Sequence, residues 1–190
     1  MALTNDVLLA NRMQLLQSHG ITRDPNEMTH PSDGPWYYQQ IDLGFNYRMT
    51  DLQAALGLSQ MQRLDEFVAK RHIMANQYDQ FLAELSVITP WQHADSYSGY
   101  HLYVIRLKLA EISKTHCQVF KELRTAGIGV SLHYIPIYFQ PYYEKLGFKE
   151  GYCPEAEKYY KQAISLPMYP GLTQLQQNKV NEVLWQIIAN

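Results

Sequence analysis

Apolar residues recur at three- and four-residue steps through the middle of the chain, which is the spacing of one helix face. The series consists of Met61, Leu64, Val68, Ala75, Tyr78, Leu82 and Leu85. It predicts one long helix over residues 51–85 that connects two parts of the chain. The polar pair Arg71-His72 interrupts the apolar series, so we expect the helix to bend there.

The rest of the chain mixes helical spacing with short stretches of strict alternation. We expect helices at 5–18, 113–126, 155–162 and from 173 onward, and strands at 100–109, 129–132 and 164–168. In the first of these strands His101 falls on the same side as Tyr103 and Ile105, so we expect its ring in the core. Consecutive strand–helix–strand units are missing from this pattern. It predicts an α+β fold with a small mixed or antiparallel sheet covered by helices.

Residues 21–43 have no regular pattern, and Pro25, Pro31 and Pro35 forbid a continuous helix there. Connections this long inside a compact protein are usually functional or lie at an interface. We therefore expect this stretch to contact a second subunit or to form the rim of a site.

The long helix begins with a recognisable signal. Thr50 and Gln53 have the spacing of a capping box, and Asn46 and Arg48 stand just before it. A helix N-terminus beside an amide and a guanidinium is a suitable place for a phosphate. The alternative is that these residues only accompany an ordinary helix start.

Composition narrows the functional classes. The chain has 190 residues, of which 46% are hydrophobic, so it can form a core, and the net charge of −2 comes from scattered charges. This excludes the clustered basic face of a nucleic-acid-binding protein, and no stretch reaches the roughly 20 apolar residues of a membrane span. Cys117 and Cys153 lie far apart without metal-ligand spacing. We expect reduced thiols in a cytoplasmic protein and no metal site.

A series of short motifs runs along nearly the whole chain. They are Gly44-Phe45-Asn46-Tyr47-Arg48 with Ala54-Ala55-Leu56-Gly57, His101-Leu102-Tyr103-Val104, Gly127-Ile128-Gly129-Val130, His133-Tyr134-Ile135-Pro136, Leu146-Gly147-Phe148 and Leu166-Pro167-Met168-Tyr169-Pro170-Gly171-Leu172-Thr173. In this order and spacing they resemble the DegT/DnrJ/EryC1/StrS family of sugar aminotransferases, which use pyridoxal phosphate (PLP). Within that family the resemblance is closest to the transaminases that aminate a UDP-linked 4-keto-6-deoxy sugar on the way to pseudaminic acid.

The resemblance implies roles for five residues. Asn46 would bind the cofactor phosphate held by the other subunit of a homodimer, with Arg48 beside it. His133 and Tyr134, just past a predicted strand, would line the nucleotide-sugar pocket. Tyr138 is assigned to the same pocket, at a position where many relatives carry a second histidine.

The family enzymes are about twice as long as this chain, and the lysine that forms a Schiff base with the cofactor lies upstream of a segment like residues 1–5. The chain therefore resembles the C-terminal part of a fold-type I PLP aminotransferase. On this basis residues 1–50 are the end of the large domain with a dimer-contact loop, 51–85 are a long inter-domain helix, and 86–190 are a small α+β domain.

The resemblance also sets the expected activity. The complete enzyme would transfer an amino group from glutamate to a nucleotide-linked 4-keto-6-deoxy sugar, in polysaccharide biosynthesis. Lys70, Lys114 and Lys121 lie on polar helix faces, where solvation is the expected role, and match no family lysine. We therefore expect no catalytic residue in this chain, no PLP held by it alone, and no activity alone. The alternative is a non-catalytic module that binds a partner or dimerises.

Overall fold

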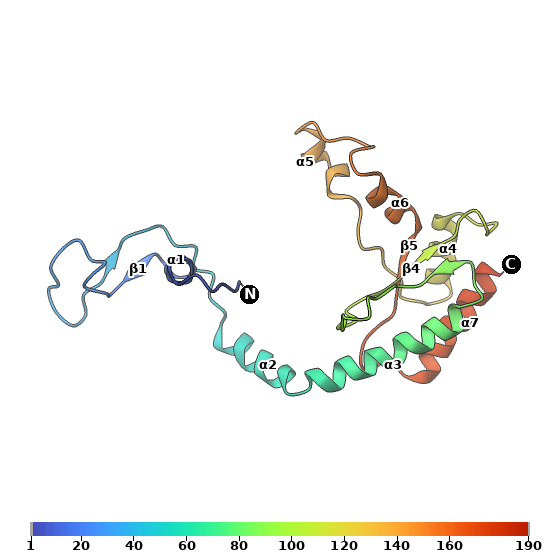
Figure 1. Ribbon diagram of the computed structural model, residues 1–190, viewed down its shortest axis with the longest axis horizontal. Coiled ribbons are helices and arrows are strands. Elements are labelled where there is room, and N and C mark those ends of the chain that lie inside the picture. The colour runs from blue at the N-terminus through green and yellow to red at the C-terminus, as the bar shows by residue number, and fades with distance from the viewer. Residues whose placement is uncertain (1, 190) are drawn as a thin grey trace. The chain divides into compact units, whose positions relative to one another are not determined.

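The computed structural model of the protein describes residues 2–189, and these form two compact units that divide between Gln62 and Arg63. The first unit contains α1 (Val7–Gln17), β1 (Ile21–Thr22), β2 (Gln39–Gln40) and α2 (Asp51–Met61) (Figure 1). Strands β1 and β2 pair antiparallel.

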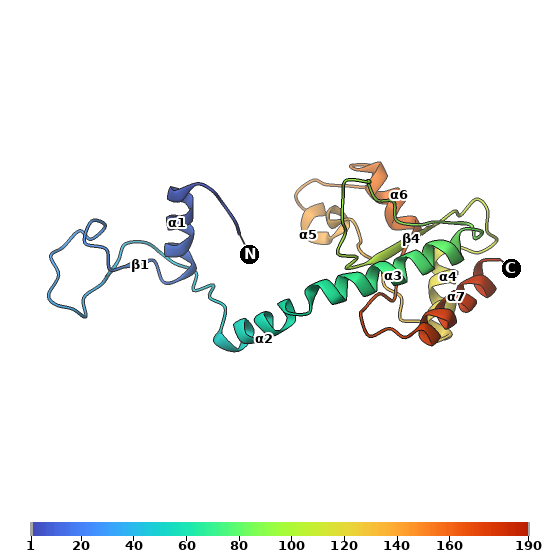
Figure 2. The same ribbon diagram turned by 60° about the horizontal axis from the view of Figure 1, so that its bottom comes forward.

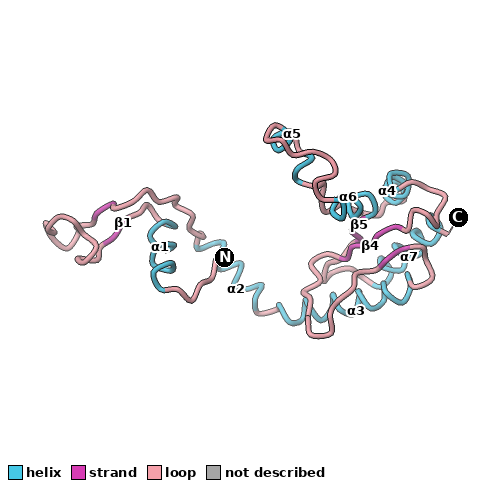
Figure 3. Tube along the Cα trace, turned by 45° about the horizontal axis from the view of Figure 1, so that its top comes forward, coloured by secondary structure: helices cyan, strands magenta, loops and turns pink. Residues whose placement is uncertain are grey.

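The second unit is built around a small sheet. Its elements are α3 (Leu64–Leu82), β3 (Val87–Ile88), β4 (Tyr103–Leu107), α4 (His116–Thr125), a 3-10 turn η1 (Ile137–Phe139), α5 (Pro141–Glu144), α6 (Pro154–Gln162), β5 (Ala163–Leu166) and α7 (Gln174–Ile188). The three strands lie in the order β3-β4-β5 and are all antiparallel. Figure 3 shows these short strands in magenta among the helices. This arrangement confirms the predicted α+β class.

Strand β4 supplies the centre of the core. Its alternation buries Tyr103, Ile105 and Leu107 completely, because side chains two apart share one face of a strand. Helices α3, α4 and α7 bury their apolar faces in the same cluster, and α6 contacts β4. Figures 1 and 2 place α6 and α3 on opposite sides of the sheet. Val180, Leu184 and Ile187 of α7 are buried, as the helical spacing predicted.

Two buried tyrosines join α3 to the sheet. The rings of Tyr78 and Tyr103 lie 4.9 Å apart. The Tyr78 hydroxyl donates to the Pro167 carbonyl oxygen at 3.0 Å, and the Tyr103 hydroxyl donates to Asp79 Oδ1 at 2.5 Å. Burial raises the pKa of both hydroxyls, and the Asp79 carboxylate adds to the rise at Tyr103. Both phenols therefore stay neutral, with their polar tips paired.

The expected long helix is divided. Helix α2 ends at Met61 and α3 begins at Leu64, so the helix is interrupted at Gln62 and Arg63, whereas α3 continues through Arg71-His72. The break coincides with the boundary between the units, because the buried face of α3 starts only at Met74 while α2 buries no residue. The helical spacing continues across this break, which is why the sequence did not reveal it.

Three further expectations need correction. His101 is exposed, because Tyr100 has a positive φ of 42° and turns the backbone before β4 begins at Tyr103. The strand expected at 129–132 is reduced to an isolated bridge between Ser131 and Ser165. The connection 21–43 contains the β1–β2 pair, whose strands of two residues each are too short to show a period.

The first unit has almost no core. Among its described residues only Gly20, Thr22 and Gln39 are buried. Helix α2 buries none, and its large apolar side chains Leu52, Leu56, Leu58 and Met61 are all exposed. None of the helices formed by residues 2–189 combines the length and apolar character needed to cross a bilayer. The same residues contain no group of three or more His, Cys, Asp or Glu side chains that could hold a metal ion.

Candidate functional site

Gly44 lets the segment before α2 lie against the end of α1. A Cβ atom on Gly44 would lie 2.2 Å from the Ser18 carbonyl oxygen, so the two backbones approach closely only with glycine at this position. Phe45 N then donates to Leu16 O, and Asn46 N donates to Ser18 O, both at 2.8 Å. The glycine of the Gly-x-Asn motif thus serves to place Asn46.

Asn46 and Arg48 come together on the exposed surface of the first unit. Asn46 has a left-handed backbone with φ 55°, which asparagine adopts more readily than most residues. Arg48 Nε donates to Asn46 Oδ1 at 2.9 Å. Within residues 2–189 neither the Asn46 Nδ2 nor the Arg48 Nη atoms have a further partner. Their N–H groups are therefore available to an acceptor from outside.

The start of α2 follows directly. The Thr50 capping box is confirmed: Gln53 N donates to Thr50 Oγ1 at 3.3 Å, and Thr50 N donates to Gln53 Oε1 at 3.0 Å. Asp51 stands in the first helical turn, where its charge suits the helix dipole. The positive end of α2 thus begins just after Arg48 in the chain.

This donor set fits a phosphate. A carboxamide and a guanidinium with unused N–H groups, next to a helix N-terminus, are groups that proteins use to bind phosphate. Asp51, in the first turn of α2, is a carboxylate of opposing charge. The residues present therefore fit the phosphate of PLP, which the family resemblance implies.

In the second unit, His133 and Tyr134 form a separate pair. The Tyr134 ring meets the His133 imidazole edge-on, with ring centroids 4.6 Å apart. His133 Nδ1 lies 2.7 Å from the Oγ of Ser165, a buried residue of β5. His133 is half-buried and Tyr134 is exposed. The structure thus brings these two predicted residues together beside β5.

Tyr138 has a different environment. Its side chain is only 8% exposed, and its hydroxyl lies 2.9 Å from Glu157 Oε1 and 3.1 Å from the Cys153 carbonyl oxygen. Burial, with the Glu157 carboxylate as the next contribution, raises the pKa of Tyr138. Gly151 N also donates to Glu157 Oε1, at 2.6 Å. The Tyr138 hydroxyl is therefore engaged inside the protein.

Of the lysines considered above, Lys70 lies on α3, Lys121 lies on α4, and Lys114 stands just before α4. Lys70 pairs with Glu66 at 2.6 Å, and Lys121 is exposed. Lys114 differs from the expected solvated lysine. Its Nζ lies 2.9 Å from Glu122 Oε2 and donates to the Ile187 carbonyl oxygen, also at 2.9 Å. Lys114 thus holds the end of α7 near α4.

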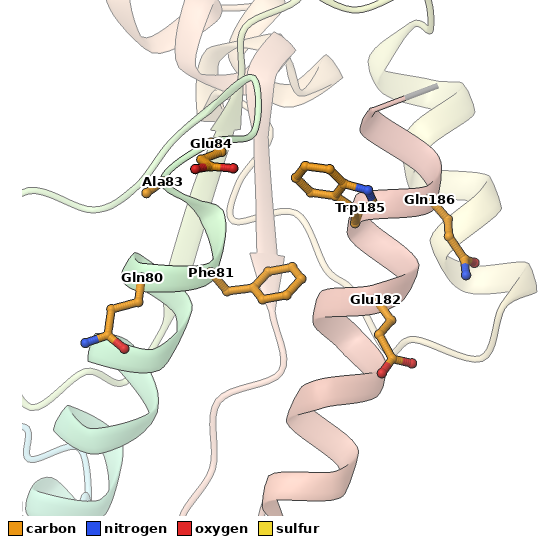
Figure 4. A pocket seen from close by; sticks show the side chains of 7 residues that line it. All are labelled: Gln80, Phe81, Ala83, Glu84, Glu182, Trp185 and Gln186. Atoms are coloured by element: carbon orange, nitrogen blue, oxygen red, sulfur yellow. The ribbon is translucent and has the colours of Figure 1, made fainter.

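A separate groove runs between α3 and α7 and has a volume of about 570 Å³. Figure 4 shows the rings of Phe81 and Trp185 leaning into it from the two helices. Its other lining residues are Gln80, Ala83, Glu84, Glu182 and Gln186. None of the five predicted site residues lines it, so this groove provides control positions for binding experiments.

Sequence reasoning missed Ser165 and Glu157. Both are buried polar residues that hold predicted site residues in place. Glu157 stands on a charged helix face and has no local signal, whereas Ser165 stands within a short apolar strand. A search for polar residues within apolar strands would have found Ser165.

Comparison with known proteins agrees with these motifs. Residues 1–185 match the model of the DegT/DnrJ/EryC1/StrS aminotransferase family. The spore coat polysaccharide biosynthesis protein SpsC of Bacillus subtilis is 35% identical over 191 residues, covering 99% of this chain and 49% of SpsC. The UDP-4-amino-4,6-dideoxy-N-acetyl-beta-L-altrosamine transaminase of Campylobacter jejuni is 32% identical over 184 residues, covering 95% of this chain and 45% of that enzyme.

Solved structures show the same fold. Helicobacter pylori PseC, an aminotransferase involved in the biosynthesis of pseudoaminic acid, superposes with a TM-score of 0.85 at 26% identity, covering 98% of this chain and 47% of PseC. The chain spans about half the length of the curated relatives it matches. The motifs, the fold and the match over residues 1–185 lead to one conclusion: this chain belongs to the DegT/DnrJ/EryC1/StrS aminotransferase family.

Proposed function

We propose that this chain is the C-terminal part of a PLP-dependent enzyme that transfers an amino group from glutamate to a nucleotide-linked 4-keto-6-deoxy sugar. The names of two relatives support a sugar substrate: one is a polysaccharide biosynthesis protein and the other is a transaminase of a UDP-linked amino sugar. We propose that the complete enzyme is a cytoplasmic homodimer.

In this proposal Asn46 and Arg48 bind the phosphate of the cofactor held by the partner subunit. The Asn46 amide donates N–H groups, and the Arg48 guanidinium supplies positive charge. The hydrogen bond from Arg48 Nε occupies the Asn46 Oδ1 atom and so orients the Asn46 amide. The Asn46 Nδ2 atom then faces the acceptor. When bound, PLP supplies the electron sink for amino transfer. The availability of these N–H groups is the observation that carries the proposal.

His133 and Tyr134 line the nucleotide-sugar pocket in the same proposal. The imidazole offers a hydrogen bond to an oxygen of the substrate, and the exposed Tyr134 ring offers a flat apolar surface to the nucleotide or sugar. Tyr138 supports this pocket from inside the protein. Its hydroxyl is hydrogen-bonded to Glu157, and its ring contacts that of Phe139 with centroids 5.0 Å apart. It stabilises the segment that follows His133.

The pocket is tested by titrating the chain with UDP and following the backbone amides by NMR. We expect weak binding, with a Kd on the order of 1 mM, and shifts centred on His133 and Tyr134. His133→Ala should weaken binding about tenfold, as expected for a hydrogen bond to a charged phosphate. Trp185→Ala, in the α3–α7 groove, is the control and should leave the affinity unchanged. If the amide signals that shift at about 10 mM UDP belong to another part of the chain, His133 and Tyr134 are not in the substrate pocket.

A second candidate function is a non-catalytic module that binds a partner or dimerises through the first unit. The specific observation is α2, whose large apolar side chains are all exposed. Leu52, Leu56 and Met61 are 85%, 63% and 64% exposed, and exposed apolar surface of this kind marks interaction sites.

Sedimentation velocity tests this candidate. We expect the sedimentation coefficient of the chain to rise with concentration, because association covers the apolar face of α2. The double variant Leu52→Ser/Leu56→Ser should shift the chain towards the monomer. Leu175→Ser, at an 80% exposed position of α7, is the matched control and should behave like the unaltered chain. A strict monomer at all concentrations would contradict the candidate.

A further inference from the structure

We infer that Ser165 is a positioning residue, which selects the tautomer of the neutral His133 imidazole with the proton on Nε2 and presents that N–H to a phosphate oxygen of the nucleotide. The ligand part of this inference rests on the proposed function. The positioning part rests on the geometry around β5 alone.

Ser165 is a rigid support. It is 4% exposed and lies opposite Val104 of β4 in the sheet register. On its other side Ser165 N donates to Ser131 O at 2.8 Å, and Ser131 N donates to Ser165 O at 3.2 Å. The backbone of Ser165 is therefore held by β4 on one side and by the isolated Ser131 bridge on the other, and burial confines its side chain. His133, two residues after Ser131, is held beside it.

The protons between Ser165 and His133 can be assigned by counting partners. The two atoms Oγ and Nδ1 lie 2.7 Å apart, so one of them donates. The Ser165 hydroxyl has no other partner among residues 2–189. If Nδ1 carried the proton, the serine O–H would be buried without an acceptor, which is costly. The favourable arrangement has the serine donating to an unprotonated Nδ1, and the neutral ring then carries its proton on Nε2.

The Nε2–H group is open to a ligand. In the described part of the chain, the buried side-chain nitrogen and oxygen atoms without a partner belong to Arg71, Gln162 and Asn181. His133 Nε2 is not one of them, and it has no partner within the same residues. It is therefore reached by solvent. A phosphate oxygen can accept a hydrogen bond from this N–H group, whereas the opposite tautomer would direct the Nε2 lone pair at the anion.

Long-range ¹H–¹⁵N NMR of the 190-residue chain measures the tautomer directly. Spectra recorded at about pH 8.5, where an ordinary imidazole is neutral, should show His133 with Nε2 protonated and Nδ1 unprotonated. His72 and His116 are internal references. Their Nε2 atoms lie 2.8 Å from Ser98 O and 2.9 Å from Ala163 O, and a carbonyl oxygen can only accept. A protonated Nδ1 at His133 overturns the inference.

Variants of Ser165 test the cause. In Ser165→Ala we expect the His133 ¹⁵N shifts to move towards a mixture of tautomers, while the shifts of His72 and His116 stay in place and report an intact fold. Ser165→Thr keeps the hydroxyl and should restore the original His133 shifts. Unchanged His133 shifts in Ser165→Ala would show that the serine does not control the ring. The tautomer of the unaltered chain decides the proton assignment even if a variant does not fold.

Titration with UDP separates this inference from the proposed function. Ser165→Ala should weaken UDP binding about fivefold, as expected for one hydrogen bond, and Ser165→Thr should restore it. If the tautomer is as inferred but UDP does not perturb His133, the ligand part and the proposed pocket fail while the positioning role stands. If UDP binds at His133 but Nδ1 carries the proton, the positioning role fails and the proposed pocket stands.

Discussion

Purified alone, this chain is expected to transfer no amino group from glutamate to a UDP-linked 4-keto-6-deoxy sugar, even with PLP added. The reaction needs an amine that carries the cofactor, and the resemblance places that lysine upstream of this segment. Lys70 and Lys114 are each paired with a glutamate. We expect the rate of amino transfer to equal that of a blank without protein. This corresponds to the loss of an enzymatic acceleration of about 10⁶-fold or more. Mass-spectrometric detection of the amino sugar measures it.

The full-length Campylobacter jejuni relative, assayed in parallel, is the positive control. The chain alone should also fail to develop the visible absorbance of enzyme-bound PLP. Turnover that rises in proportion to the concentration of the chain, and that is abolished by removing either glutamate or PLP, would contradict the prediction. It would mean that one of the lysines described above can leave its partner and act.

Leu184→Ala should destabilise the second unit by about 2–5 kcal/mol. Leu184 is 0% exposed on the buried face of α7, so its truncation removes apolar contacts and leaves a cavity. A single domain is typically stable by about 5–15 kcal/mol, so the loss takes a large share. Urea unfolding followed by circular dichroism measures the change as a lower midpoint at an unchanged slope.

Leu175→Ala is the matched control, because it makes the same substitution on the same helix at a side chain that is 80% exposed. We expect its free energy of unfolding to stay within about 0.5 kcal/mol of the original. Equal effects of the two variants would mean that α7 is not packed in the core as described.

Helix starts and buried faces were predictable because their causes are local. The capping boxes at Thr50 and Thr173 each join residues three positions apart. The buried faces of β4 and α7 follow from the two-residue period of a strand and the 3.6-residue period of a helix. The break between α2 and α3 was not predictable, because the helical spacing runs through it. The two-residue strands β1 and β3 are too short to show a period.

By itself the sequence determined the fold class and the family motifs, and through the resemblance it predicted the site residues Asn46, Arg48, His133, Tyr134 and Tyr138. Only the tertiary structure decided which neighbours hold them. Gly44 meets the end of α1, and His133 meets a serine 32 residues further on. The tertiary structure also places the Tyr138 hydroxyl in the interior, where it is hydrogen-bonded to Glu157. The physical reason is that helix caps and apolar faces depend on residues a few positions apart, whereas buried hydrogen bonds depend on distant segments that meet only after packing.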